Sequence, residues 1–407
     1  MLNDSPNQTP ENDFRTVMRR CGQPPVLPPF GDAFEASQRP KRAIPTNEQL
    51  ALAKLNKDEK RRRDREAKIR RRRRHFRMSV ILFFATLAST TLVGDYYRPL
   101  EILMGFFNPE LESRILAELN SSYPVATTQT PTLLQRFFES VGRGCTYSCP
   151  VMLILLCHEM GHYLQAVRNK VRASFPYFIP LPILPLGTMG AVIFQGKSDR
   201  KSMFDIAVSG PIAGLVVTLP VLYFGIQSSG FMPAQFSPFQ FGQPLLIEWL
   251  IEFLHGPTPS GMVFAWNGLA TAGWVGVFIT AMNLLPIGQL DGGHLMYTLI
   301  GKAAHGIAWA LIVIAITCLI IFKMYSYGLL LILLGLTGPR HPPTTDDRMK
   351  IGWFRHLLGW VTLSFLLIGF TPRPIVLPDS EPINVAEVLQ SLKGAGEDIW
   401  NTLTSKK

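Results

Sequence analysis

The sequence predicts an all-α polytopic membrane protein with about seven transmembrane helices and one re-entrant segment that resembles a β-hairpin. Hydrophobic residues make up 47% of its 407 residues, whereas only 17% are charged. Several apolar runs contain no charged residue and are long enough to cross the hydrocarbon core of a membrane as helices. The positive charge is concentrated in one stretch that precedes the first of these runs. A chain of two or three soluble domains is therefore the weaker interpretation.

Seven apolar segments are the predicted spans. We expect them at about residues 78–94, 150–167, 204–225, 261–285, 306–322, 325–337 and 353–370. The first two enclose a predicted outer loop at 95–147, with amphipathic helical pieces such as 111–119. Because Lys and Arg favour the cytoplasmic side, the N-terminus is predicted to be cytoplasmic, and an odd number of crossings places the C-terminal tail outside.

The same pattern divides the chain into four regions. A disordered, Pro-rich region at 1–50 precedes a basic cytoplasmic juxtamembrane helix at 51–77. A polytopic membrane domain follows at 78–370, with its functional core at 150–300. The remaining residues, 371–407, form a C-terminal tail with one amphipathic stretch.

The basic segment at 54–77 carries almost the whole charge of the chain. It contains 14 Lys and Arg against 4 Asp and Glu, a net charge of +10 out of +11. Such a segment binds either nucleic acid or anionic lipid. Because it directly precedes a predicted span, anionic lipid is the expected partner and nucleic acid is the weaker alternative.

An apolar segment at 175–193 is unsuited to a regular helix. It contains four prolines and two glycines, and each internal proline removes a helical hydrogen bond. Irregular backbone at membrane depth is tolerated only where protein shelters it or it lines a cavity. The segment therefore predicts a re-entrant loop or β-hairpin, and a loop on the membrane surface remains the alternative.

The motif H-E-x-x-H at 158–162 closes the second predicted span. On a helix, residues four apart lie on one face, so His158 and His162 can bind one zinc ion together. Glu159 beside them can hold the attacking water. The alternative is a helix that carries two unrelated histidines.

A third ligand is needed, because catalytic zinc has three protein ligands and one open position. The best candidate is Asp291, within a D-G-G sequence near the end of the fourth span, since an acid at membrane depth is costly and usually functional. Gly292 and Gly293 would let the backbone turn the carboxylate toward the metal. A simple helix cap is the alternative for this aspartate.

Together these motifs resemble the site-2 protease family of intramembrane zinc metalloproteases, in its bacterial and plastid branch without a PDZ domain. H-E-x-x-H is followed by N-x-x-P at 283–286 and by D-G-G at 291–293, and the stretch 175–214 resembles the bacterial and plastid branch. The sequence H-P-P-T at 341–344 matches more loosely. The resemblance implies that His158, His162 and Asp291 bind Zn²⁺, that Glu159 is catalytic and that Asn283 contacts substrate. The chain departs from some members in having His294 where Arg often follows D-G-G.

The expected function is hydrolysis of a peptide bond in or near a transmembrane segment of a membrane-protein substrate. Gly187 and Gly190 belong to a segment that could offer a strand edge to the unwound substrate. The alternatives are a non-proteolytic relative and a transporter that uses the same polar residues.

Two further expectations concern the cellular setting. The bacterial inner membrane is the first choice for localisation and a plastid membrane the second, because the N-terminus does not resemble a transit peptide. Cys145 and Cys149 are expected to be free thiols, since a helical i,i+4 pair is poorly placed for a disulfide, which remains the alternative.

Overall fold

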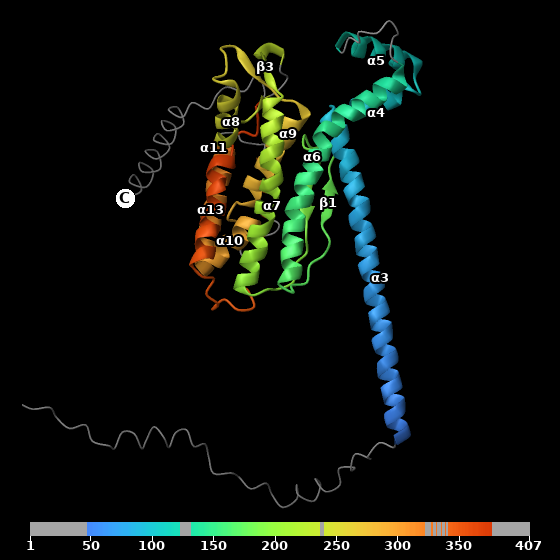
Figure 1. The fold of residues 1–407 in the computed structure, drawn as a ribbon, viewed down its shortest axis with the longest axis vertical. Helices are drawn as coiled ribbons and strands as arrows, with labels where there is room; N and C mark the ends of the chain where they lie inside the picture. The colour runs from blue at the N-terminus through green and yellow to red at the C-terminus, as the bar shows by residue number, and fades with distance from the viewer. Residues whose placement is uncertain are drawn as a thin grey trace, which may run out of the picture. The chain divides into compact units, whose positions relative to one another are not determined.

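The structure is a computed structural model that describes residues 47–122, 132–236, 240–321 and 341–376, together with positions 327, 328, 331, 335 and 338 (Figure 1). Most of the predicted disordered region, most of the predicted span at 325–337 and nearly all of the C-terminal tail lie outside the described residues. The chain forms two compact units, Met1–Arg70 and Arg71–Lys407.

The described chain is mostly helical. Its helices are α3 (Asn47–Gly94), α4 (Arg98–Gly105), α5 (Pro109–Ser122), α6 (Leu133–Arg168), α7 (Arg200–Gln227), α8 (Leu245–His255), α9 (Gly268–Asn283), α10 (Asp291–Ile300), α11 (Ala304–Ile321) and α13 (Trp353–Gly369). Its short strands are β1 (Tyr177–Pro180), β2 (Thr188–Val192), β3 (Gly230–Pro233), β4 (Gln240–Phe241), β5 (Met262–Ala265) and β6 (Ile375–Val376), paired as β1–β2, β3–β5 and β4–β6.

Four stretches of helix are long and apolar enough to cross a membrane. They are Leu55–Gly94, Leu133–Arg168, Arg200–Gln227 and Asp291–Ile321, and the shorter apolar helices Gly268–Asn283 and Trp353–Gly369 accompany them. The protein is thus a multi-pass membrane protein. The predicted span at 261–285 is partly wrong, because Met262–Ala265 forms strand β5 and only α9 is helical there.

Helix α6 begins much earlier than the predicted span at 150–167. Thr132 caps it in a reciprocal capping box with Gln135, and the helix passes through Pro150 without ending. Hydropathy failed here because the first part of α6 is polar, although it buries Arg136 and Ser140 on one face. Most of the predicted outer loop at 95–147 is accordingly helical, and α5 contains the predicted piece at 111–119.

The proline-rich segment forms an antiparallel pair of strands. Phe178 of β1 lies opposite Ala191 of β2, and a register irregularity follows Phe178. In Figure 1 this hairpin lies between α6 and the part of α3 that belongs to the second unit. Ser79 of α3 donates a hydrogen bond to the Pro176 carbonyl at 2.5 Å, and Ser89 donates one to the Gly187 carbonyl at 2.6 Å. Two serine hydroxyl groups of α3 therefore hold the hairpin, one just before β1 and one in the turn before β2.

Small residues let α6, α7 and α9 pack closely. A Cβ added at Gly161 of α6 would lie 2.5 Å from the Ser209 carbonyl oxygen of α7, and one at Gly273 of α9 would lie 2.5 Å from the Leu222 Cα atom. Such contacts are how helices associate in membranes, where apolar side chains gain little by leaving lipid. The small residues at 209–214 predict a helix contact, and this part of α7 does pack against α6.

Candidate metal centre

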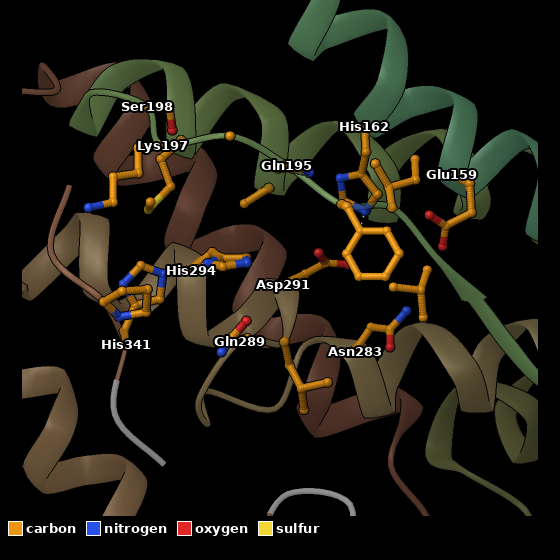
Figure 2. A pocket seen from close by; sticks show the side chains of 18 of the residues that line it. Glu159, His162, Gln195, Lys197, Ser198, Asn283, Gln289, Asp291, His294 and His341 are labelled. Carbon is orange, nitrogen blue, oxygen red and sulfur yellow. Dashed lines mark hydrogen bonds and ion pairs between the residues drawn. The ribbon is translucent and has the colours of Figure 1, made fainter. Parts of the chain in front are cut away.

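The three predicted ligands converge on one point. The Nε2 atoms of His158 and His162 lie 3.2 Å apart, and each lies 3.2 Å from Oδ2 of Asp291. Both imidazoles are buried, and the ligand atoms of all three residues lie within 4.8 Å of one another. Two imidazoles and a carboxylate in this arrangement can hold one metal ion. Figure 2 shows His162 and Asp291 facing each other.

The orientation of His162 is determined by helix α7. Its Nδ1 atom lies 2.8 Å from the Ile206 carbonyl oxygen, so the Nδ1–H donates there and the Nε2 atom faces Asp291. Helix α7 approaches this closely because it presents Gly210 and Gly214 to the two imidazoles. A Cβ at Gly210 would lie 2.0 Å from Nε2 of His162, and one at Gly214 would lie 3.0 Å from Nδ1 of His158. The small residues at 209–214 indicate helix packing, and nothing in the sequence indicates that two of these glycines contact the ligands.

Replacing Gly210 by Ala is expected to weaken the affinity for the metal by about 10- to 100-fold, as loss of a contact that orients a ligand does. The purified protein should therefore contain less metal. The new methyl group must displace the His162 ring, which the Ile206 carbonyl holds at Nδ1 and which would bind the metal through Nε2. Elemental analysis after dialysis measures the effect. Gly142→Ala on α6 is the matched control, because a Cβ there meets nothing within 4 Å. Equal metal content in both variants would refute this role for Gly210.

Asp291 is the first residue of α10, and the two glycines after it have a different role from the one expected. Both are helical, so neither bends the backbone toward the metal. A Cβ at Gly292 would lie 2.0 Å from the Leu284 carbonyl oxygen, and one at Gly293 would lie 2.4 Å from that of Gly288. The glycines therefore let the start of α10 pack against the turn that follows α9, and this contact places Asp291.

Glu159 and Asn283 complete the site. Both line a cavity of about 570 Å³ that also contains the three ligand residues, which we call the His158 cavity. Glu159 is 6% exposed, and Figure 2 shows its carboxylate directed into this cavity on the side of Asn283. The Asn283 Nδ2 atom lies 3.4 Å from Nε2 of His158. All five polar residues predicted for the site thus lie together.

The predicted substrate-contacting glycines lie elsewhere. Neither Gly187 nor Gly190 lines the His158 cavity; both have positive φ, 72° and 90°. Gly187 packs against α3, where a Cβ would lie 2.8 Å from the Thr90 Cα atom. The hairpin residues that do line the cavity begin at Ala191. Of the hairpin, only the end of β2 and the residues that follow it can therefore contact a molecule bound in this cavity.

A second pair of histidines lines the same cavity. Nδ1 of His294 lies 2.5 Å from Nε2 of His341, and Tyr297 stacks on His341 with ring centroids 4.6 Å apart. Burial lowers the pKa of the His341 imidazole, so this ring is neutral near pH 7. His294, which stands where some family members have Arg, thus contacts His341 of the H-P-P-T sequence. Local spacing does not predict this contact.

Residues 146–324 match peptidase family M50. The chain contains a peptidase family M50 domain. This domain includes every predicted catalytic and ligand residue, and the match confirms the resemblance to the site-2 protease family.

Two plant proteins show the same relationship. The chain is 34% identical over 248 residues to the "Probable zinc metalloprotease EGY1, chloroplastic" of Oryza sativa subsp. japonica. The matched region covers 56% of the chain and 38% of that protein. It is 27% identical over 321 residues to the protein of the same name in Arabidopsis thaliana, covering 72% of the chain and 53% of that protein. The chain thus spans between about a third and about half of these relatives' length. No solved structure matches.

Cys145 and Cys149 are both free in the structure, together with Cys157 and Cys318. The expectation of free thiols at 145 and 149 stays a prediction.

Proposed function

We propose that the protein is an intramembrane zinc metalloprotease, which hydrolyses a peptide bond in or near a transmembrane segment of another membrane protein. The observation that carries this proposal is the convergence of His158, His162 and Asp291 beside Glu159, inside a bundle of apolar helices. Two imidazoles, a carboxylate and an open fourth position are the donor set of catalytic zinc sites. The printed names of the plant relatives, which are probable zinc metalloproteases, support the choice of metal.

The residues of the site suit peptide hydrolysis. When bound, zinc lowers the pKa of a coordinated water and polarises the scissile carbonyl group. Glu159 accepts a proton from that water as its oxygen attacks the carbonyl carbon, and it then donates the proton to the leaving amine nitrogen as the C–N bond breaks. His162 keeps its Nε2 atom aimed at the centre through the Ile206 carbonyl. Asn283 lines the same cavity as the three ligand residues, and its Nδ2 atom can donate a hydrogen bond to the substrate main chain there.

The substrate is an extended segment of a single-span membrane protein. A transmembrane helix must unwind before its carbonyl groups become accessible, and its exposed backbone then needs new partners. We propose that the hairpin β1–β2 lies at membrane depth and that β2 adds the substrate as a further strand, with its end at Ala191 and Val192 beside the metal. Gly187 and Gly190 then shape the hairpin around the substrate strand.

The printed names of the relatives favour a plastid membrane over the bacterial inner membrane, since both plant proteins are chloroplastic. The N-terminus then faces the stroma, with the basic segment at 54–77 bound to anionic lipid rather than nucleic acid. Dependence of cleavage on anionic lipid in reconstituted vesicles tests this partner.

Removal of the metal tests the proposed function. Treatment of purified, detergent-solubilised protein with a zinc chelator is expected to stop cleavage of a model single-span substrate, and one equivalent of Zn²⁺ per chain is expected to restore it. A transporter or a non-proteolytic relative would show no cleavage before chelation. Cleavage that survives complete loss of zinc would contradict the proposal.

A further inference from the structure

Another cavity lies where α3 ends, and five of its fifteen lining residues are aromatic. It has a volume of about 570 Å³, and we call it the Tyr96 cavity. Its aromatic residues come from the turn after α3, from α6, from β4 and from the link between β5 and α9: Tyr96, Tyr97, Tyr147, Phe241 and Trp266. None of its lining residues belongs to the His158 cavity. It is therefore a separate site.

The polar groups of this cavity carry no net charge. Asp95 is 5% exposed and accepts hydrogen bonds from Nε and Nη2 of Arg143 at 3.0 and 3.1 Å. Ser140 donates a further hydrogen bond to the same carboxylate. The carboxylate is thus neutralised by the guanidinium group. The paired Asp95 and Arg143 offer no free charge to bind a phosphate, and aromatic rings pack well against an aromatic or aliphatic side chain.

Tyr96 and Tyr97 adopt a backbone conformation that disfavours large side chains. Their φ angles are 52° and 63°, in the left-handed region. Their amide groups cap α3, with Tyr96 N–H bonded to the Val93 carbonyl at 3.0 Å and Tyr97 N–H bonded to that of Leu92 at 2.7 Å. Glycine is the usual residue in such a cap. The rings nevertheless lie at the cavity, and Tyr96 is 62% exposed, so its ring contributes little to folding. Strained residues of this kind cluster at binding sites.

The hairpin connects the Tyr96 cavity with the metal centre. Ile183 and Pro185 of its turn form part of the cavity wall, and the Tyr147 hydroxyl donates to the Leu186 carbonyl at 2.9 Å. The other end of the hairpin, at Ala191 and Val192, lines the His158 cavity. Among the described residues β2 pairs only with β1, which leaves its second edge for another strand. Since a strand rises about 3.3 Å per residue, an extended peptide on that edge reaches the turn within about five residues.

We propose that the Tyr96 cavity is a distal substrate site, which binds an aromatic or aliphatic side chain about five residues from the scissile bond. This inference rests on the proposed function. It identifies the substrate class as single-span proteins. In such a substrate, the residue that lies beside the end of α3 is bulky and apolar. Selection there would be by side-chain shape and not by charge.

Photocrosslinking of the full-length protein tests the site without requiring cleavage. Tyr96 is replaced by p-benzoylphenylalanine in protein that also carries Glu159→Gln, in detergent with a model single-span substrate. One version of the substrate has Trp five residues from its cleavage position and the other has Ser. We expect about tenfold more crosslinking to the Trp version, because burial of such a side chain changes affinity by at least that factor. The same crosslinker at Phe107, which is 85% exposed and outside the cavity, should not discriminate.

The variant Tyr96→Gly provides the second measurement. Glycine suits the positive φ at this position, so the variant should fold, and its preference for the Trp over the Ser substrate in kcat/KM should fall about tenfold. Crosslinks to detergent or lipid alone, equal crosslinking to both substrates, or an unchanged preference in Tyr96→Gly would overturn the proposal. If the wild-type protein cleaves neither substrate but crosslinking retains the Trp preference, the proposed proteolysis fails and the distal site stands.

Discussion

Replacing Glu159 by Gln is expected to lower the rate of substrate cleavage by about 10²- to 10⁴-fold, the usual contribution of a general acid–base group. The amide has nearly the same shape as the carboxylate but cannot accept a proton from the attacking water. Because Glu159 is not one of the three converging ligand residues, the variant should retain its zinc. Quantification of cleavage products and of zinc in one preparation measures both effects.

The control for this variant is Glu248→Gln, at the start of α8 and outside the His158 cavity. It removes the same charge and should leave cleavage within about twofold of wild type, as surface substitutions away from special features generally do. Near-wild-type cleavage by Glu159→Gln would assign the proton transfer to another group. Loss of zinc in that variant would instead make Glu159 a ligand.

Replacing Asp291 by Asn is expected to remove zinc from the purified protein and cleavage with it. The neutral amide is a much poorer ligand than a carboxylate, and loss of one of three protein ligands should cost more than the roughly 10- to 100-fold in affinity typical of groups behind the ligands. Isothermal titration of the metal-free variant with Zn²⁺ measures the effect.

Asp199→Asn is the matched control for the loss of a carboxylate. Asp199 caps α7 by accepting hydrogen bonds from the amide groups of Lys201 and Ser202, and Asn caps helices about as well. This variant should bind zinc like the wild-type protein. If Asp291→Asn also does so, the third ligand lies elsewhere and the assignment of Asp291 is wrong.

The central residues of the site were predictable because their chemistry follows from spacing along the chain. His158 and His162 share a face of α6 through the i,i+4 spacing of any helix. Asp291 is 133 positions beyond His158, so no local spacing indicated it. The need for a third ligand, the cost of an acid in a membrane and the family resemblance of D-G-G together did so. The geometry brings these three side chains together with Asn283.

The supporting residues could not be predicted from local pattern. Gly210 and Gly292 appear in the sequence only as small residues, and whether each faces an imidazole or a carbonyl group depends on how α7 and α10 pack. The beginning of α6 was missed for a different reason. Hydropathy detects the part of a helix that lies in lipid, whereas the capping box at Thr132 starts this helix well before its apolar part.

The Tyr96 cavity could not be predicted from the sequence. Its walls come from segments between Val93 and Thr271 that have no common motif. Left-handed backbone at Tyr96 is also unexpected, since glycine or asparagine is the residue that normally indicates it. The proline-rich hairpin, by contrast, was foreseeable because its prolines exclude a helix.

X-ray absorption at the zinc K-edge of the purified, zinc-loaded protein tests the central claim most directly, namely that His158, His162 and Asp291 hold one zinc ion. The account predicts two imidazole nitrogens at about 2.0–2.1 Å and oxygen ligands at about 2.0–2.2 Å in a four-coordinate site. It also predicts loss of one imidazole in His158→Ala. A sulfur ligand at about 2.3 Å, or a spectrum unchanged by His158→Ala, would contradict it.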